Sequence, residues 1–137
     1  MTDTTITIER DFRAPRQLVF DAWTTAEQFA QWFGSLPART SLDVTVGGKW
    51  SAIMEYEGKE LTFYGEFQEI VEPERLVLSF TDGSGPGFAT VTVDLTENDG
   101  VTHMTFSQVG PLPAEQVDAA TEGWKLFFDE LEKIVTA

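Results

Sequence analysis

The stretch FDAWTTAEQFAQWFG, residues 20–34, places five aromatic side chains in fifteen positions. Its middle is a pair of threonines, Thr24 and Thr25, each standing three residues before a Glu or Gln, which is the signature of a capping box at the start of a helix. Gly34 then offers a typical helix end, and Pro37 cannot prolong the helix. The stretch therefore predicts two short helices that meet at the threonine pair, with three rings along one side of the second helix.

On both sides of this stretch the sequence alternates between apolar and polar residues, with the period of two that is typical of strands. Upstream, residues 5–12 form one such segment. Downstream, short turns separate six more segments, which predicts an antiparallel meander. The alternation breaks at residues 69–71, which indicates a β-bulge. The six downstream segments cover residues 41–46, 50–57, 61–71, 76–80, 89–95 and, around Met104 and Phe106, the last strand.

The last part of the chain, residues 111–137, repeats its apolar residues at intervals of three and four and predicts one long helix. Gly123 stands in the middle of this helix, where glycine costs up to about 1 kcal/mol relative to alanine. Clearance for the sheet or room for a ligand would explain the choice. The sequence thus predicts one α+β domain over residues 1–137: a curved, seven-stranded antiparallel sheet, two short helices after the first strand, and a long C-terminal helix packed across the sheet.

The composition excludes several classes of function. The 137 residues carry a net charge of −14, from 23 acidic and 9 basic side chains, and include no cysteine. The scattered basic residues form no face that could follow a nucleic-acid backbone, and the negative charge disfavours anionic membrane surfaces. No apolar segment reaches the roughly 20 residues of a membrane helix, and no secretory signal is visible. We therefore expect a cytoplasmic protein with no nucleic-acid or membrane partner.

Residues with catalytic or metal-binding chemistry are few. The single histidine, His103, shares the polar face of its strand with Thr105 and Ser107, which predicts a solvent-facing side chain rather than a general base. With one histidine and no cysteine, a transition-metal site would consist mostly of carboxylates, which is unusual. We predict no catalytic residues, no metal site and no cofactor.

Five stretches of the sequence, taken in order, resemble a known family. They are VFDAWTTAEQFAQWFG, LDVTVGGKWSAIM, YGEFQEIVEPERLVLSF, VTHMTFSQVG and EGWKLFFDELEKIV. Together they are similar to the family called activator of the heat-shock-protein-ninety ATPase homologue. The order of the elements is that of the larger START-like, Bet v 1-type superfamily (SRPBCC). The resemblance covers almost the whole chain and implies the helix-grip fold.

What the resemblance implies about function is broader, because members of the superfamily bind lipids, hormones and polyketides or act as cyclases. Three functions stay open for this chain. The first is binding of a small apolar or amphipathic molecule in an internal cavity. The second is a protein-interaction module that assists a heat-shock chaperone ATPase, and the third is a cyclase- or hydrolase-type enzyme that uses the same cavity. The oligomeric state, monomer or homodimer, is open as well.

The expected fold offers a reason for the many aromatic residues. A helix in the concave side of a bent sheet cannot touch all of it, and large side chains then line a chamber, typically of roughly 300–1,000 Å³ in ligand sites. Any one of these residues could instead be solid core, and the indole N–H of Trp124 needs a partner, which a ligand oxygen could supply. The predicted ligand-binding residues are Trp32, Phe33, Trp50, Met54, Tyr56, Phe63, Phe67, Leu78, Phe80, Val91, Met104, Phe106, Trp124, Phe127, Phe128 and Leu131.

Overall fold

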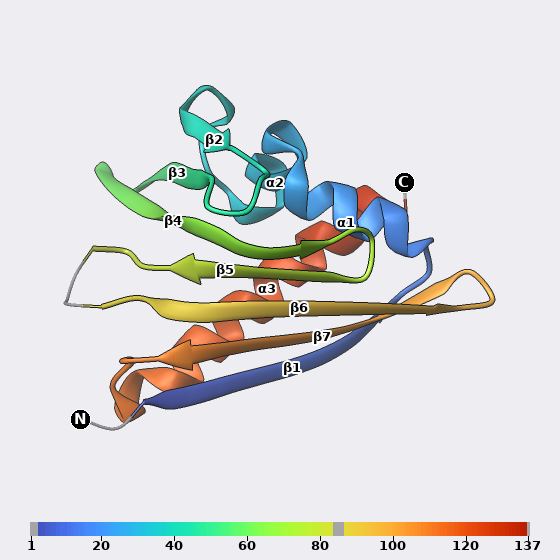
Figure 1. The fold of residues 1–137 in the computed structure, drawn as a ribbon. Coiled ribbons are helices and arrows are strands. Elements are labelled where there is room, and N and C mark those ends of the chain that lie inside the picture. The colour runs from blue at the N-terminus through green and yellow to red at the C-terminus, as the bar shows by residue number, and fades with distance from the viewer. Residues whose placement is uncertain (1–2, 84–86, 137) are drawn as a thin grey trace.

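The computed structural model describes residues 3–83 and 87–136 and shows a twisted sheet that carries its helices on one face (Figure 1). Within this part of the chain seven strands pair antiparallel in the order β1-β7-β6-β5-β4-β3-β2. This confirms the predicted seven-stranded antiparallel sheet. The strands are β1 (Thr4–Phe12), β2 (Thr40–Leu42), β3 (Lys49–Tyr56), β4 (Lys59–Val71), β5 (Arg75–Phe80), β6 (Ala89–Asn98) and β7 (Val101–Gly110).

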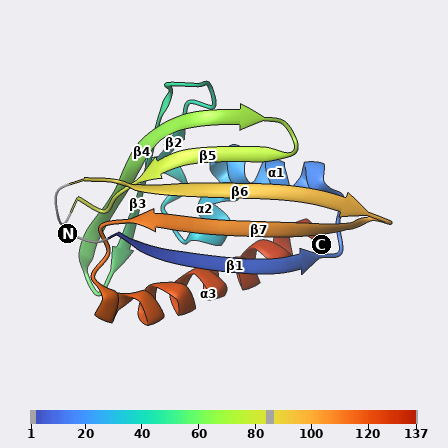
Figure 2. The ribbon, with the colours of Figure 1, turned by 60° about the horizontal axis from the view of Figure 1, so that its bottom comes forward.

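The helices follow the predicted order. Two short helices, α1 (Arg16–Thr24) and α2 (Ala26–Phe33), follow β1, and the long helix α3 (Val117–Val135) ends the described chain after a single 3₁₀ turn, η2 (Ala114–Gln116). A second 3₁₀ turn, η1 (Pro37–Arg39), leads into β2. In Figure 2 the sheet bends so that β3 and β4 stand away from the plane of β1, β7 and β6, and α3 crosses the concave side. This arrangement is the helix-grip α+β fold.

The junction of the two short helices differs in detail from the expected capping box. Thr25 occupies the N-cap position of α2 but makes no side-chain hydrogen bond there. The neighbouring Thr24 hydroxyl instead donates to the carbonyl oxygen of Phe20, one turn back in α1, at 2.9 Å. The predicted end of α2 is confirmed, because Gly34 has a left-handed φ of 81° and its N–H donates to Ala30 O at 2.9 Å.

Two strands also differ from their predicted bounds. β2 ends at Leu42 because the next residues turn back on themselves, with Thr45 N–H donating to Asp43 O and Gly48 N–H donating to Thr45 O, both at 2.8 Å. A Cβ atom at Gly48 would lie 2.2 Å from Asp43 O, so this turn requires glycine. The expected bulge in β4 is present slightly earlier than predicted, between Phe67 and Glu69.

The space between sheet and helices is filled mainly by aromatic rings. Trp23 of α1 lies 4.7 Å from Trp32 of α2, measured between ring centroids, with the two ring planes at 60°. The Trp32 indole N–H donates to Ala22 O at 2.8 Å. The Trp23 nitrogen is buried and has no hydrogen-bond partner among the described residues. Most of the opening stretch therefore belongs to the core.

Candidate functional site

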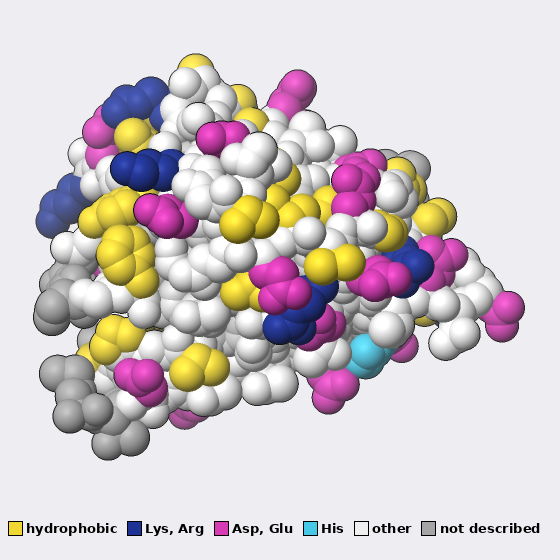
Figure 3. All heavy atoms as spheres, in the orientation of Figure 1, with side chains coloured by type: hydrophobic (Ala, Val, Ile, Leu, Met, Phe, Trp, Pro, Cys, Tyr) yellow, Lys and Arg dark blue, Asp and Glu magenta, His cyan; other side chains and the backbone are white. Residues whose placement is uncertain are grey.

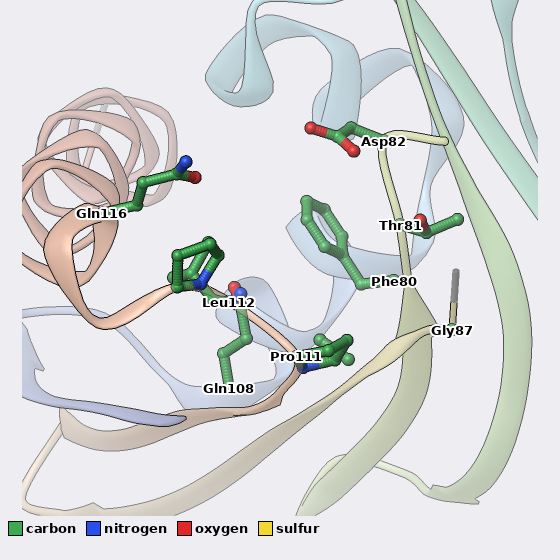
Figure 4. Close-up of a pocket in the computed structure, with 10 residues that line it drawn as sticks. Phe80, Thr81, Asp82, Gly87, Gln108, Pro111, Leu112 and Gln116 are labelled. Atoms are coloured by element: carbon green, nitrogen blue, oxygen red, sulfur yellow. The ribbon is translucent and has the colours of Figure 1, made fainter. Parts of the chain in front are cut away.

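A pocket of about 400 Å³ opens between the N-terminal half of α3 and the end of the sheet where β5 and β7 finish. A smaller hollow of about 140 Å³ adjoins it and shares five of its lining residues (Figure 4). The larger pocket is lined by Phe33, Phe63, Phe80, Asp82, Gln108, Leu112, Gln116, Ala119, Ala120, Gly123, Trp124 and Phe127.

Five aromatic rings form the floor of this pocket, which we call the aromatic floor. They come from α2, β4, β5 and α3, so the fold brings together segments that are far apart in the sequence. Successive ring centroids lie 4.9–5.7 Å apart around the set, which closes on itself from Phe127 back to Phe33. These are distances at which aromatic pairs attract one another. The rings belong to Phe33, Phe63, Phe80, Trp124 and Phe127.

The wall that α3 contributes is made of small residues. Ala119, Ala120 and Gly123 lie at helical spacing and all line the pocket. A Cβ atom built on Gly123 would meet no atom within 4 Å. Gly123 therefore lies beside open space and is not in contact with the sheet. The small side chains of this wall keep the pocket wide.

Polar groups are concentrated at two places in the pocket. In its depth, the Trp124 indole N–H donates to Oε1 of Gln108 at 2.8 Å, and the Gln108 side chain is itself buried. At the rim, Asp82 and Gln116 face each other from opposite sides of the pocket (Figure 4). The partner that the Trp124 nitrogen needs is thus supplied by the protein.

The sixteen residues predicted to contact a ligand fall into three groups in the structure. The five of the aromatic floor line the pocket. Met54 is partly buried at the edge of the core, and Tyr56, at the end of β3, is 63% exposed. The other nine are buried in the core away from the pocket: Trp32, Trp50, Phe67, Leu78, Val91, Met104, Phe106, Phe128 and Leu131.

Sequence reasoning missed the polar residues of the pocket. Gln108 continues the inward face of β7 after Met104 and Phe106, so a polar residue at an apolar position of the alternation was the available signal. Asp82 and Gln116 lie in a loop and at the start of α3, where no periodic pattern indicates which way a side chain points.

His103 lies on the outer face of the sheet, outside the pocket, as predicted (Figure 3). Its Nδ1 is 2.6 Å from Asp11 Oδ1, and its Nε2 is 3.0 Å from Glu9 Oε1 on the neighbouring strand β1. The hydrogen bonds to Asp11 and then to Glu9 raise the pKa of His103 above its usual value. Both ring nitrogens face carboxylates of β1 on the outer face of the sheet, and neither is directed toward the pocket.

Within residues 3–83 and 87–136, no group of three or more His, Asp or Glu side chains is arranged to hold a metal ion. None of the helices in this described part combines the length and the apolar character needed to cross a bilayer. The lining of the pocket offers aromatic rings, two carboxamides and the carboxylate of Asp82.

Comparison with known families matches residues 13–136 to the model of activator of Hsp90 ATPase homolog 1-like proteins. The chain belongs to this family. The match spans from the end of β1 to the end of α3, and so includes every element that contributes to the pocket. No functionally curated protein shows a significant match to the chain.

Solved structures similar to this family member share its whole fold. Protein CV1439 from Chromobacterium violaceum has a TM-score of 0.86 at 20% identity, with 98% of this chain and 99% of that chain covered. Protein SA2116 from Staphylococcus aureus, described as a protein of unknown function, reaches 0.82 at 21% identity, with 98% and 95% covered. The Mll3558 protein from Rhizobium loti reaches 0.80 at 26% identity, with 96% of each chain covered.

Proposed function

We propose that this protein binds a small apolar or amphipathic molecule in the pocket between α3 and the sheet. The observation that carries the proposal is the aromatic floor beneath a pocket of about 400 Å³. This volume lies within the range of roughly 300–1,000 Å³ that is usual for small-molecule sites, which are mostly apolar with a few polar groups. The pocket has this composition, with Gln108, Asp82 and Gln116 as its polar groups.

The free energy for binding would come from the partly exposed rings. Phe63, Phe80 and Phe127 are each only partly buried, although they stand beside the fully packed core. Each Å² of apolar surface that a ligand covers contributes roughly 25 cal/mol, before the entropic costs of association are subtracted. A rigid ligand loses less conformational freedom on binding, so we expect a ligand with a rigid body that fits the floor.

The experiment that tests the proposal uses Gly123, because it lines the pocket and a Cβ atom added there would meet no neighbour within 4 Å. Gly123→Phe should fill the pocket, whereas Gly123→Ala should leave nearly all of it open. Nile red, a neutral apolar dye, is titrated into each protein and its fluorescence is followed. We expect binding to the parent protein and to Gly123→Ala, and loss of binding in Gly123→Phe. Equal binding by all three proteins would place the dye elsewhere and contradict the proposal.

A second function is favoured by the family description alone, which names an activator of the Hsp90 ATPase. On that basis we also consider a protein-interaction role, in which the chain would raise the ATP turnover of a chaperone. Steady-state ATP hydrolysis by the purified chaperone, with and without this protein, tests it directly. Unchanged turnover at saturating protein would exclude the role. A cytoplasmic location would suit either function.

A further inference from the structure

The orientation of the Gln108 carboxamide in the pocket is fixed by chemistry. The Trp124 indole nitrogen can only donate a hydrogen bond, so the atom that faces it at 2.8 Å must be the carbonyl oxygen Oε1. The usual ambiguity between the two ends of a glutamine amide does not arise here. The amide nitrogen Nε2, which carries two N–H donors, therefore points the other way.

The N–H donors of Gln108 have no acceptor within the described part of the protein. The side chain is 8% exposed, and it lines both the main pocket and the adjoining hollow. In the described residues, Trp23 Nε1 is sealed from solvent and has no hydrogen-bond partner. Nε2 of Gln108 is not sealed in this way. Figure 4 shows the side chain rising from β7 toward Leu112 and the pocket. The pocket thus contains a fixed donor that can reach a ligand.

The charge around the pocket disfavours anionic ligands. Asp82 contributes a negative charge at the rim, and the twelve lining residues include no Lys, Arg or His. The whole chain adds a net charge of −14. An anion that entered the pocket would lose hydration and gain no cationic partner.

We propose that the ligand presents an uncharged oxygen acceptor, such as a ketone, ester or ether oxygen, to Nε2 of Gln108, with a flat apolar body on the aromatic floor. Carboxylates and phosphates, including free fatty acids, are excluded by the same site. This inference rests on the proposed binding function and names the ligand class for it. Trp124 is the positioning residue, since its N–H holds the amide so that the donors face the ligand.

Three probes of one shape test the inference by equilibrium dialysis at pH 7 in 0.5 M NaCl, which screens the general charge of the protein. They are 2-acetylnaphthalene, with a carbonyl acceptor, 2-ethylnaphthalene, without one, and 2-naphthoate, an anion. Because the two neutral probes differ in hydrophobicity, each of them is compared between protein variants rather than with the other; 2-naphthoate is compared with the ketone in the parent protein. Gln108→Met removes the donor, Gln108→Glu removes it while keeping an acceptor for Trp124, and Gln31→Met is an exposed glutamine control on α2.

We expect Gln108→Met and Gln108→Glu each to weaken 2-acetylnaphthalene binding roughly tenfold, and Gln108→Met to change 2-ethylnaphthalene binding less than about twofold. Gln31→Met should change neither, and 2-naphthoate should bind the parent protein at least about tenfold more weakly than the ketone. Equal weakening of both neutral probes by Gln108→Met, or tight binding of 2-naphthoate, would overturn the inference and leave the binding function standing. If none of the three probes binds the parent protein, the inference is overturned, and the binding function then stands or falls with the Nile red titration.

Discussion

Gly65 of β4 is the tightest packed glycine in the sheet. A Cβ atom there would lie 1.9 Å from Ser79 O and 2.8 Å from the Trp50 indole nitrogen. That nitrogen donates to the same Ser79 oxygen at 2.9 Å. The strand β5 and the Trp50 ring therefore both approach β4 at a point where no side chain fits, and glycine is required by space rather than by backbone angle.

We predict that Gly65→Ala destabilises the protein by about 3 kcal/mol, the upper end of the range for overpacking, because the clash is with backbone that cannot move independently. Gly123→Ala is the matched control, since the same methyl group there meets no neighbour and should stabilise α3 by up to about 1 kcal/mol. Urea unfolding followed by tryptophan fluorescence measures both. A loss below about 1 kcal/mol for Gly65→Ala would show that β5 can shift away.

His103 predicts a pH dependence of stability. Its pKa is raised in the folded protein, mainly by the hydrogen bond to Asp11. Its stabilising contribution is therefore fully present below the unfolded pKa of about 6.5 and is lost as pH rises through the higher folded value. The ring is 44% exposed, so solvent screens the effect and we expect it to be small.

The measurement compares the parent protein with His103→Gln in urea unfolding at pH 5.5 and pH 8.5. The difference between the two proteins should be larger at the lower pH. Asp11→Asn should lower the pKa of His103, as observed by NMR titration of the ring protons. An unchanged pKa in that variant would contradict the assigned partner.

At the scale of single residues, the sequence indicates which side chains are buried more readily than what they contact. The rings of residues 20–34 could be assigned to the interior from helical spacing. That Trp124 donates to Gln108, and Trp32 to Ala22 O, depends on distances across the fold that no local pattern contains. The pocket's polar residues were missed for the same reason.

Among the elements, Arg10 links α3 to β1, which is an edge strand of the sheet. Arg10 of β1 reaches both Asp129 and Glu132 of α3 at 2.8 Å, and its side chain is 24% exposed. Burial alone would lower the pKa of Arg10, but the hydrogen bonds to Glu132 and Asp129 outweigh it and the pKa is raised. This explains why an arginine interrupts the apolar face of the first strand.

We predict that Arg10→Met lowers the free energy of unfolding by about 1 kcal/mol. The loss is no larger because solvent screens the ion pairs at the half-exposed carboxylates. Arg75 is the comparison, since it also bridges two carboxylates, Glu69 and Asp94, but stays within the sheet and is 39% exposed. Arg75→Met should cost less. Urea unfolding in low salt measures both, and equal losses would argue against a special role for the α3 tether.

All seven predicted strands are present, and one of them is shorter than its alternating pattern. Alternation over β1, β3 and β6 extends for eight to ten residues and located these strands. The segment 41–46 alternates too, yet hydrogen bonds within the following turn end β2 after three residues. The capping-box pattern at Thr25 failed because a side chain that matches a motif is not obliged to form its hydrogen bond.

For the whole molecule, the sequence predicted an interior shared between core and chamber but not the boundary between them. Nine of the proposed lining residues fill space in the core, whereas small residues on α3 leave the other end open. That division depends on how far the helix stands from the sheet at each turn. Periodicity fixes the face of a residue but carries no information about this distance.

The surface charge predicts a salt response of the whole protein. Acidic side chains outnumber basic ones by 23 to 9, and Figure 3 shows several of them spread over the outer face of the sheet. Their mutual repulsion opposes the compact state, and salt shortens its range from about 10 Å at 0.1 M to about 3 Å at 1 M. We expect the thermal midpoint to rise between 20 mM and 500 mM NaCl.

Differential scanning fluorimetry measures this midpoint. The rise of the midpoint with salt should become smaller as the pH is lowered toward the isoelectric pH of about 4.2, because the protein then carries less net charge for salt to screen. A gain that is independent of pH would mean that salt acts through a route other than screening.

The close, inclined approach of Trp23 and Trp32 has a spectroscopic consequence. Two indoles at this separation exchange excitation energy, and their inclination makes the coupled transitions optically active. We expect a pair of far-ultraviolet circular dichroism bands of opposite sign. Trp32→Phe should weaken them by removing this pair, whereas Trp23→Phe would also remove the pair of Trp23 and Trp124, whose ring centroids lie 6.5 Å apart. Since one chromophore comes from each of the two short helices, the couplet would report when these helices dock during refolding, without any label.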